Sequence, residues 1–172
     1  MQHVLRLSLT ALAAAAFVFV AGLASAQTPA PSPKQIKLTE PQVTGFISAH
    51  KDMAEAFDKV PSEKSDAAID AQLDSVAKRF GFKDHKEYEE VAANVIMVFI
   101  AIDPQTKAFT DPPTLTKQKL EEAKVDKSLS DEDRKQVLED LAEELKVVQP
   151  IIHPSNVDLV KKFYDKIEPL LQ

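Results

Sequence analysis

The sequence predicts an all-α protein, a single-domain bundle of about six helices. Apolar residues recur at the spacing of a helical face in one segment after another, and capping residues precede several of these segments. Glycine is scarce, at three in 172 residues, and no Asn-Gly or Asp-Gly pair marks a hairpin turn. Within the bundle we expect a buried central helix over residues 84–102.

The first 26 residues have the pattern of a secretory signal peptide. Arg6 precedes an apolar run over residues 9–23, and the segment ends in Ala-Ser-Ala at 24–26. We expect cleavage after Ala26 and export to the periplasm or the medium. An uncleaved membrane anchor is the alternative, because the run is just long enough to span a bilayer. No basic cluster follows that would halt transfer, which favours cleavage.

A short spacer separates this segment from the helical domain. Residues 27–37 (QTPAPSPKQIK) contain three prolines among small and polar residues, which predicts an extended, disordered stretch. The helical domain occupies residues 38–172. Its first helix begins at Thr39, an N-cap whose capping-box partner is Gln42, and ends at Pro61.

The second and third helices have equally clear boundaries. The second is predicted over residues 65–80, and Gly81 follows as the C-terminal glycine. The third opens at Asp84, with Glu87 as its capping-box partner. Every residue from 95 to 102 is apolar, which predicts that this half of the helix is buried on all sides.

Two further features adjoin the central helix. Asn94 is the polar residue that enters the apolar run, and we expect it to make a structural hydrogen bond; contact with a ligand is the alternative. Residues 103–113 form the longest internal loop, and loops of this length are often functional. Phe109 within it is expected to pack back on the bundle; an exposed docking point is the alternative.

Three more helices complete the predicted bundle. Thr114 is expected to cap the fourth and Ser130 the fifth. The sixth is predicted over about residues 155–171, with Pro169 fraying its end. The fifth helix is expected to bury a core face made of Val137, Leu138, Leu141, Leu145 and Val148.

The composition excludes several classes of function. A formal net charge of −6 argues against nucleic acid and anionic membranes as partners, since both require a basic patch. The chain has no cysteine, so disulfides, thiolate metal sites and cysteine nucleophiles are excluded. With so little glycine there is no phosphate loop, dinucleotide fingerprint or nucleophile elbow. We therefore expect no cofactor and assign no catalytic residue.

The histidines offer little metal chemistry. His50 lies close in sequence to Asp52 and Met53, which would allow a copper or zinc site, but no HExxH or Glu-x-x-His pattern is present. We expect His50 on the polar edge of its helix, His85 on the surface at the first helical position, and His153 in an interhelical turn. The prediction is no metal site.

A row of carboxylates lies on one face of the second helix. Asp66, Asp70 and Asp74 are four residues apart, and like charges at that spacing repel. We expect a solvated face that keeps the protein soluble; a site for a cation or a basic partner is the alternative.

These observations favour binding over catalysis. The most specific prediction is an exported, soluble, non-catalytic protein-interaction or chaperone-like module. The alternative is a carrier of a small apolar ligand, with a pocket against the central helix around Ile96, Phe99 and Phe163. An external apolar patch favours the first and an enclosed apolar pocket favours the second.

One short motif resembles a known family. Residues 38–42 (LTEPQ) fit the LTxxQ signature of the CpxP/Spy-like periplasmic helical proteins, and residues 129–134 (LSDEDR) resemble a degenerate second copy. The resemblance covers about ten residues and implies an exported helical stress protein, some of whose relatives chaperone unfolded clients. Helix capping explains the same residues, because both stretches have the pattern of a helix N-terminus.

Overall fold

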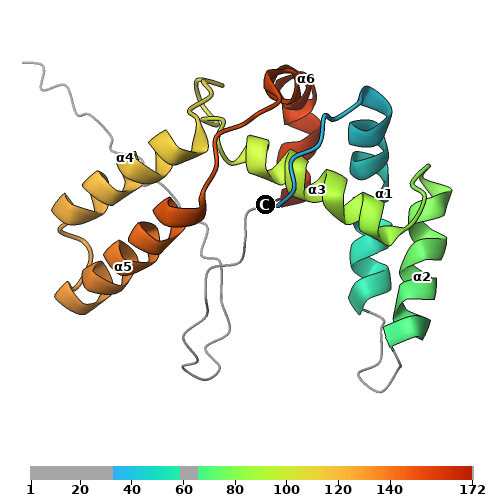
Figure 1. Ribbon diagram of the computed structural model, residues 1–172, viewed down its shortest axis with the longest axis horizontal. Coiled ribbons are helices and arrows are strands. Elements are labelled where there is room, and N and C mark those ends of the chain that lie inside the picture. Colours follow the sequence, from blue (N-terminus) through green and yellow to red (C-terminus); the bar gives the residue numbers. More distant parts are fainter. Residues whose placement is uncertain (1–32, 59–65, 172) are drawn as a thin grey trace, which may run out of the picture.

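The computed structural model describes residues 33–58 and 66–171 (Figure 1). Within those ranges the chain forms six helices and no strand, which confirms the all-α prediction. The helices are α1 (Glu40–Asp58), α2 (Asp66–Arg79), α3 (His85–Phe99), α4 (Pro112–Val125), α5 (Asp131–Val147) and α6 (Pro154–Leu171). The predicted signal peptide, most of the predicted spacer and Pro61 lie outside the described residues.

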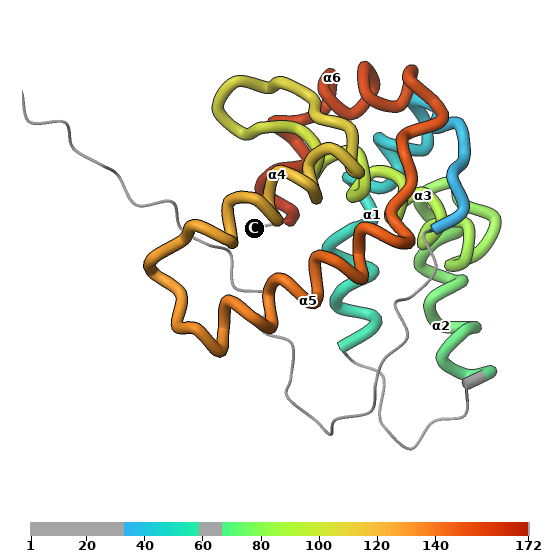
Figure 2. Tube along the Cα trace, turned by 60° about the vertical axis from the view of Figure 1, so that its left-hand side comes forward, coloured from blue at the N-terminus to red at the C-terminus, as the bar shows by residue number. Residues whose placement is uncertain are grey.

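The helices divide into a body and an arm. The body consists of α1, α2, α3 and α6, which pack against one another. The arm is the hairpin of α4 and α5, which pack chiefly on each other. Figures 1 and 2 show the arm leaving the body beside the C-terminal end of α3 and pointing away from α2.

Helix α3 is the central helix of the body, as predicted. It contacts α1, α2 and α6, and Val91, Val95 and Val98 are fully buried against them. Its second half is not buried on all sides, however, because Ile96 is 36% exposed and Ile100 is 61% exposed. These two residues lie on the side of α3 that no helix of the body covers.

Capping residues mark the helix starts as the sequence predicted. The backbone N–H of Thr39 donates to Gln42 Oε1, and the carboxylate of Asp84 accepts from the backbone N–H of Glu87. Gly81 ends the turn after α2 with φ +89°, a conformation that glycine adopts without strain. The hydrogen bond between Thr39 and Gln42 therefore gives these two residues of the LTEPQ stretch a local structural role at the start of α1.

Two predictions about the arm are wrong in detail. Helix α4 begins after Asp111 and not at Thr114, since Pro112 and Pro113 occupy its first turn, where a missing N–H costs nothing.

The second wrong prediction concerns the apolar face of α5, although the start of this helix is as predicted. Ser130 caps α5 by accepting from the backbone N–H of Asp133. None of the residues of α5 is buried, so its apolar face, predicted to be core, is half-exposed. A helix that packs against only one other helix, as α5 packs against α4, cannot bury a full apolar face.

The end of α6 and the loop after α3 are both ordered. Helix α6 continues through Pro169, which was predicted to fray it. In the loop, Asp103 accepts hydrogen bonds from the backbone N–H groups of Gln105 and Thr106, and these bonds lower the pKa of its carboxyl group. Phe109 packs against the core, as expected, and pairs with Ile102 in an isolated bridge.

An extended segment before α1 crosses the body. We call residues 33–38 the strap. Its backbone is hydrogen-bonded by the side chains of Asn94 on α3 and Asn156 on α6. The side chain of Gln35 bonds the backbone of Pro150 and Ile152, so the strap also holds the connection between α5 and α6. The described part of the predicted spacer is thus extended and packed on the helices.

Candidate functional site

An apolar cleft lies between α3 and the root of the arm. Its volume is about 280 Å³. Helix α3 contributes Ala93, Ile96, Met97, Ile100 and Ala101; the arm and its ends contribute Pro112, Leu115, Thr116, Lys119, Glu144, Val148 and Gln149; and the strap contributes Pro33. We call this space the arm cleft.

The polar groups of the arm cleft are few and partly engaged. The buried hydroxyl of Thr116 donates to Glu144 Oε1 at 2.9 Å, which joins α4 to α5 at the wall of the cleft. Lys119 and Gln149 are exposed residues on its lining. The remaining lining is hydrocarbon and a thioether, so the cleft suits an apolar group and offers no constellation for acid–base or nucleophilic chemistry.

A second hollow lies near the N-terminal end of α3, where α1, α2 and α3 meet. We call it the leg pocket; its volume is about 210 Å³. It is lined by His50, Met53, Ala54, Phe57, Leu73, Tyr88 and Glu89. Phe57, near the end of α1, is 67% exposed and is thus a large aromatic ring largely open to solvent.

One face of α3 connects the two sites. Glu89, Ala93, Ile96 and Ile100 follow one another at steps of four, three and four residues, so they form a single stripe along the helix. Glu89 lines the leg pocket, and the other three line the arm cleft. Figure 1 shows the arm and the α1–α2 pair extending to the same side of α3. We call this stripe and the two hollows the α3 face.

The α3 face is adaptable as well as apolar. The chain has three methionines, of which Met53 lines the leg pocket and Met97 lines the arm cleft. Methionine side chains are flexible and polarizable, and they recur on surfaces that accept varied partners. Among the described residues, five large hydrophobic side chains are exposed, and three of them, Phe57, Ile96 and Ile100, belong to this face.

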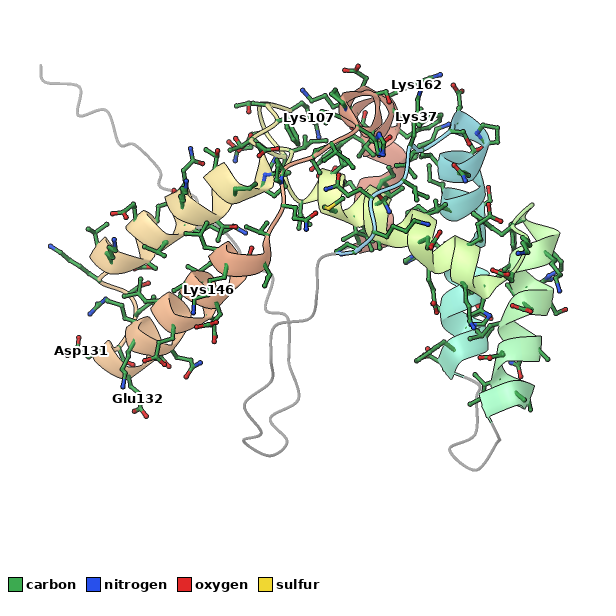
Figure 3. The ribbon with its side chains drawn as sticks, in the orientation of Figure 1. Lys37, Lys107, Asp131, Glu132, Lys146 and Lys162 are labelled. Carbon is green, nitrogen blue, oxygen red and sulfur yellow. The ribbon has the colours of Figure 1, made fainter. Side chains whose placement is uncertain are left out.

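Charged side chains cluster elsewhere. Figure 3 shows Asp131 and Glu132 at the far end of the arm, and Lys107 and Lys162 near α6. Lys162 is paired with Glu40 at 2.7 Å, and the ammonium of Lys107 lies 3.4 Å from the ring centre of Tyr164. These four charged residues lie outside the α3 face.

The pocket predicted from the sequence is present only in part. Ile96 lines the arm cleft, as expected. Phe99 and Phe163 do not: Phe99 stacks on Tyr164 with ring centres 4.6 Å apart, and Phe163 is buried in the core. The sequence analysis missed Met97, Ile100 and the arm residues. The available signal was that the second half of α3 is apolar on every side, which is more surface than three neighbouring helices cover.

The carboxylates of α2 are not an idle solvated row. His85 was predicted on the surface, but it is only 7% exposed. Its Nδ1 lies 2.6 Å from Asp74 Oδ1, its backbone N–H donates to the same oxygen, and its Nε2 lies 3.6 Å from Asp70 Oδ1. These hydrogen bonds from His85 lower the pKa of Asp74. The cluster ties α2 to the start of α3; the side chain of Asp66 lies outside the described residues.

The other histidines have structural surroundings. The ring of His50 meets that of Phe46 edge-on, with centres 5.5 Å apart, and its Nδ1 lies 3.5 Å from the hydroxyl of Tyr88. Half-buried His153 precedes α6, and its carbonyl accepts from the backbone N–H of Asn156. In the part of the chain that the structure describes, no three histidine or acidic side chains are placed to hold a metal ion.

Comparison with known proteins finds no matching family model, no similar curated protein and no similar solved structure. None of the described helices is long and apolar enough to cross a membrane.

Proposed function

We propose that this protein is an exported, non-catalytic binding protein that holds an apolar segment of another protein on the α3 face. The observation that carries the proposal is the exposure of Ile96 and Ile100 in the arm cleft, on the stripe of the central helix that also reaches the leg pocket. Fully burying an exposed side chain of this size contributes about 1.5–3 kcal/mol. Because Ile100 is 61% exposed and Ile96 is 36% exposed, a partner that covers both gains roughly as much as from one such side chain.

Export supports a chaperone-like form of this role. The signal-like pattern of residues 1–26 would deliver the chain to a compartment where unfolded segments must be held without ATP. A cysteine-free binding surface is also insensitive to the redox state of such a compartment. The two methionines of the face suit clients of varied sequence.

A titration with an unfolded protein tests the proposal. The probe is fluorescently labelled, reduced and carboxymethylated α-lactalbumin, which stays unfolded in native buffer. We expect saturable binding by the exported chain, and Ile100→Lys to weaken it by about tenfold or more. The matched control is Val125→Lys, because Val125 is 75% exposed and also lies at the C-terminal end of a helix, outside the face. Absence of binding, or equal losses in the two variants, would refute the proposal.

A second candidate function is a carrier of a small apolar ligand. The volume of the arm cleft, about 280 Å³, favours it, since it approaches the lower end of small-molecule sites, roughly 300 Å³. Native mass spectrometry of protein purified from its own host distinguishes the two. An apolar adduct that Ile100→Lys abolishes and Val125→Lys retains would favour the carrier.

A further inference from the structure

We infer that the partner segment is an amphipathic helix that lies along α3 and inserts one large apolar side chain into each hollow of the α3 face. This inference rests on the proposed function, and it specifies the chemistry and the geometry of the partner. Three observations carry it: the distance between the hollows, the scarcity of side-chain amides on the face, and the position of its charges.

The distance between the hollows sets the spacing of the anchors. The stripe from Glu89, in the leg pocket, to Ile96 and Ile100, in the arm cleft, spans seven to eleven residues. At 1.5 Å per residue this is roughly 10–17 Å along the axis of α3. A helix beside α3 covers that span with anchors seven or eleven residues apart, and both spacings return to the same helical face.

The scarcity of side-chain amides on the face favours a helix over an extended segment. Where this protein does hold an extended segment, the strap, the buried amides of Asn94 and Asn156 pair with its backbone. The residues lining the two hollows contain one side-chain amide, that of Gln149. An amide both donates and accepts, as the backbone of an extended segment requires, whereas carboxylates only accept and lysine only donates. A helix needs none of these groups, because it satisfies its own backbone.

The charges of the face orient the partner. Glu89 is exposed and lines the leg pocket, whereas Lys119 of α4 and Glu144 of α5 bring one charge of each sign to the arm cleft. A basic residue one turn from the anchor in the leg pocket complements Glu89, and the net charge of −6 favours a basic polar face on the partner.

Synthetic peptides of one composition test the spacing. Each carries two leucine anchors in an alanine, lysine and glutamine helix, with the anchors seven residues apart or nine residues apart. Nine residues place the anchors on opposite faces. We expect the seven-residue peptide to bind the exported chain about tenfold or more tightly than the nine-residue peptide, by fluorescence anisotropy. A third peptide, with proline between anchors seven residues apart, is expected to bind as weakly as the nine-residue peptide.

The outcomes separate this inference from the proposed function. Ile100→Lys is expected to remove the advantage of the seven-residue peptide, and Val125→Lys to leave it intact. If unfolded α-lactalbumin binds through the face but the three peptides bind equally, the inference is wrong and the proposed function stands. If the proline peptide binds as well as its parent, the partner is not a helix. If neither probe binds, both proposals fail.

Discussion

Asn94 on α3 and Asn156 on α6 bind the two backbone groups of one strap residue, Ile36. The N–H of Ile36 donates to Asn94 Oδ1 at 3.0 Å, and Asn156 Nδ2 donates to the carbonyl of Ile36 at 2.8 Å. The same amides also pair with the carbonyl of Lys34 and the N–H of Leu38. The sequence contains two asparagines, and both are almost completely buried, at 0% and 1% exposure.

Removing either amide should destabilise the protein. Asn94→Ala and Asn156→Ala each leave buried backbone groups unpaired, so we expect each to lower the free energy of unfolding by about 1–3 kcal/mol. The double variant should lose less than the sum, because both residues hold the same strap. Urea unfolding measures these values, with Gln118→Ala, an exposed position on α4, as the control. Losses no larger than that of the control would contradict this account of the strap.

Acid should weaken the contact between α2 and α3. His85 lowers the pKa of Asp74 below its ordinary value of 3.8 by hydrogen bonding to the carboxylate. Because the pKa of Asp74 is lower in the folded protein than in the unfolded protein, its contribution to stability is present above about pH 4. That contribution is lost as the pH falls through the pKa of Asp74 in the folded state. Asp74→Asn should lower stability at neutral pH and flatten the acid transition. Asp70→Asn should lower the stability at neutral pH less than Asp74→Asn does. The reason is distance: Asp70 Oδ1 lies 3.6 Å from His85 Nε2, whereas Asp74 Oδ1 lies 2.6 Å from His85 Nδ1. Identical acid transitions in the wild type and Asp74→Asn would contradict this.

Tyr88 should resist ionisation. Its burial raises its pKa from 10.0 to about 12, and the pKa of Tyr164 is raised as well, chiefly by burial. The chain has two tyrosines and no tryptophan, so tyrosinate absorbance reports these two residues directly. Because the folded pKa lies above the unfolded one, the stabilisation from Tyr88 is present below about pH 10 and is lost as the pH rises further. Tyr88→Phe should remove the titration near pH 12. If the substitution instead removed a titration near pH 10, the prediction would be wrong.

Two glycines should respond differently to alanine. Gly81 has φ +89° with open space around it, so Gly81→Ala should cost about 1 kcal/mol through backbone strain and Gly81→Asn less. A Cβ on Gly45 would lie 3.0 Å from the carbonyl oxygen of Phe80 and 3.1 Å from Cζ of Phe82. Gly45→Ala should therefore destabilise by forcing α1 away from the turn after α2. Urea unfolding of the three variants tests this; equal stability of Gly81→Ala and Gly81→Asn would exclude the strain.

The arm should open independently of the body. Helix α5 has no buried residue and packs on α4, whereas α3 contacts three helices of the body. Few buried contacts mean a low free energy of local opening. Hydrogen exchange followed by mass spectrometry should show α5 amides exchanging well before those of α3 under native conditions. Simultaneous exchange of both helices would mean that the arm and the body unfold as one unit.

Much of the helical framework could be predicted from the sequence, because helix ends depend on residues three or four positions apart. The Asp84 cap, the Ser130 cap and the left-handed Gly81 all occur where the local pattern places them. The exception, the start of α4, is also local: two prolines fit the first turn, so Asp111 precedes the helix and Thr114 lies inside it.

The candidate site could be predicted less well. The sequence pointed to a pocket against the central helix and to Ile96, but apolar residues at helical spacing do not reveal which of them find neighbours. Ile100 belongs to an apolar run that predicts a core residue, but it is 61% exposed. His85 was predicted on the surface, but it is buried. Both outcomes depend on helices distant in the sequence.

The sequence by itself therefore determined most of the helices and several of their caps, because these follow from residue types and local spacing. The tertiary structure decided which apolar faces became core. It set α4 and α5 apart as an arm, which left the outer side of α3 uncovered, and it brought Asn94 and Asn156 to one strap residue. Burial is a property of contacts between elements, and those contacts join residues that no local pattern relates.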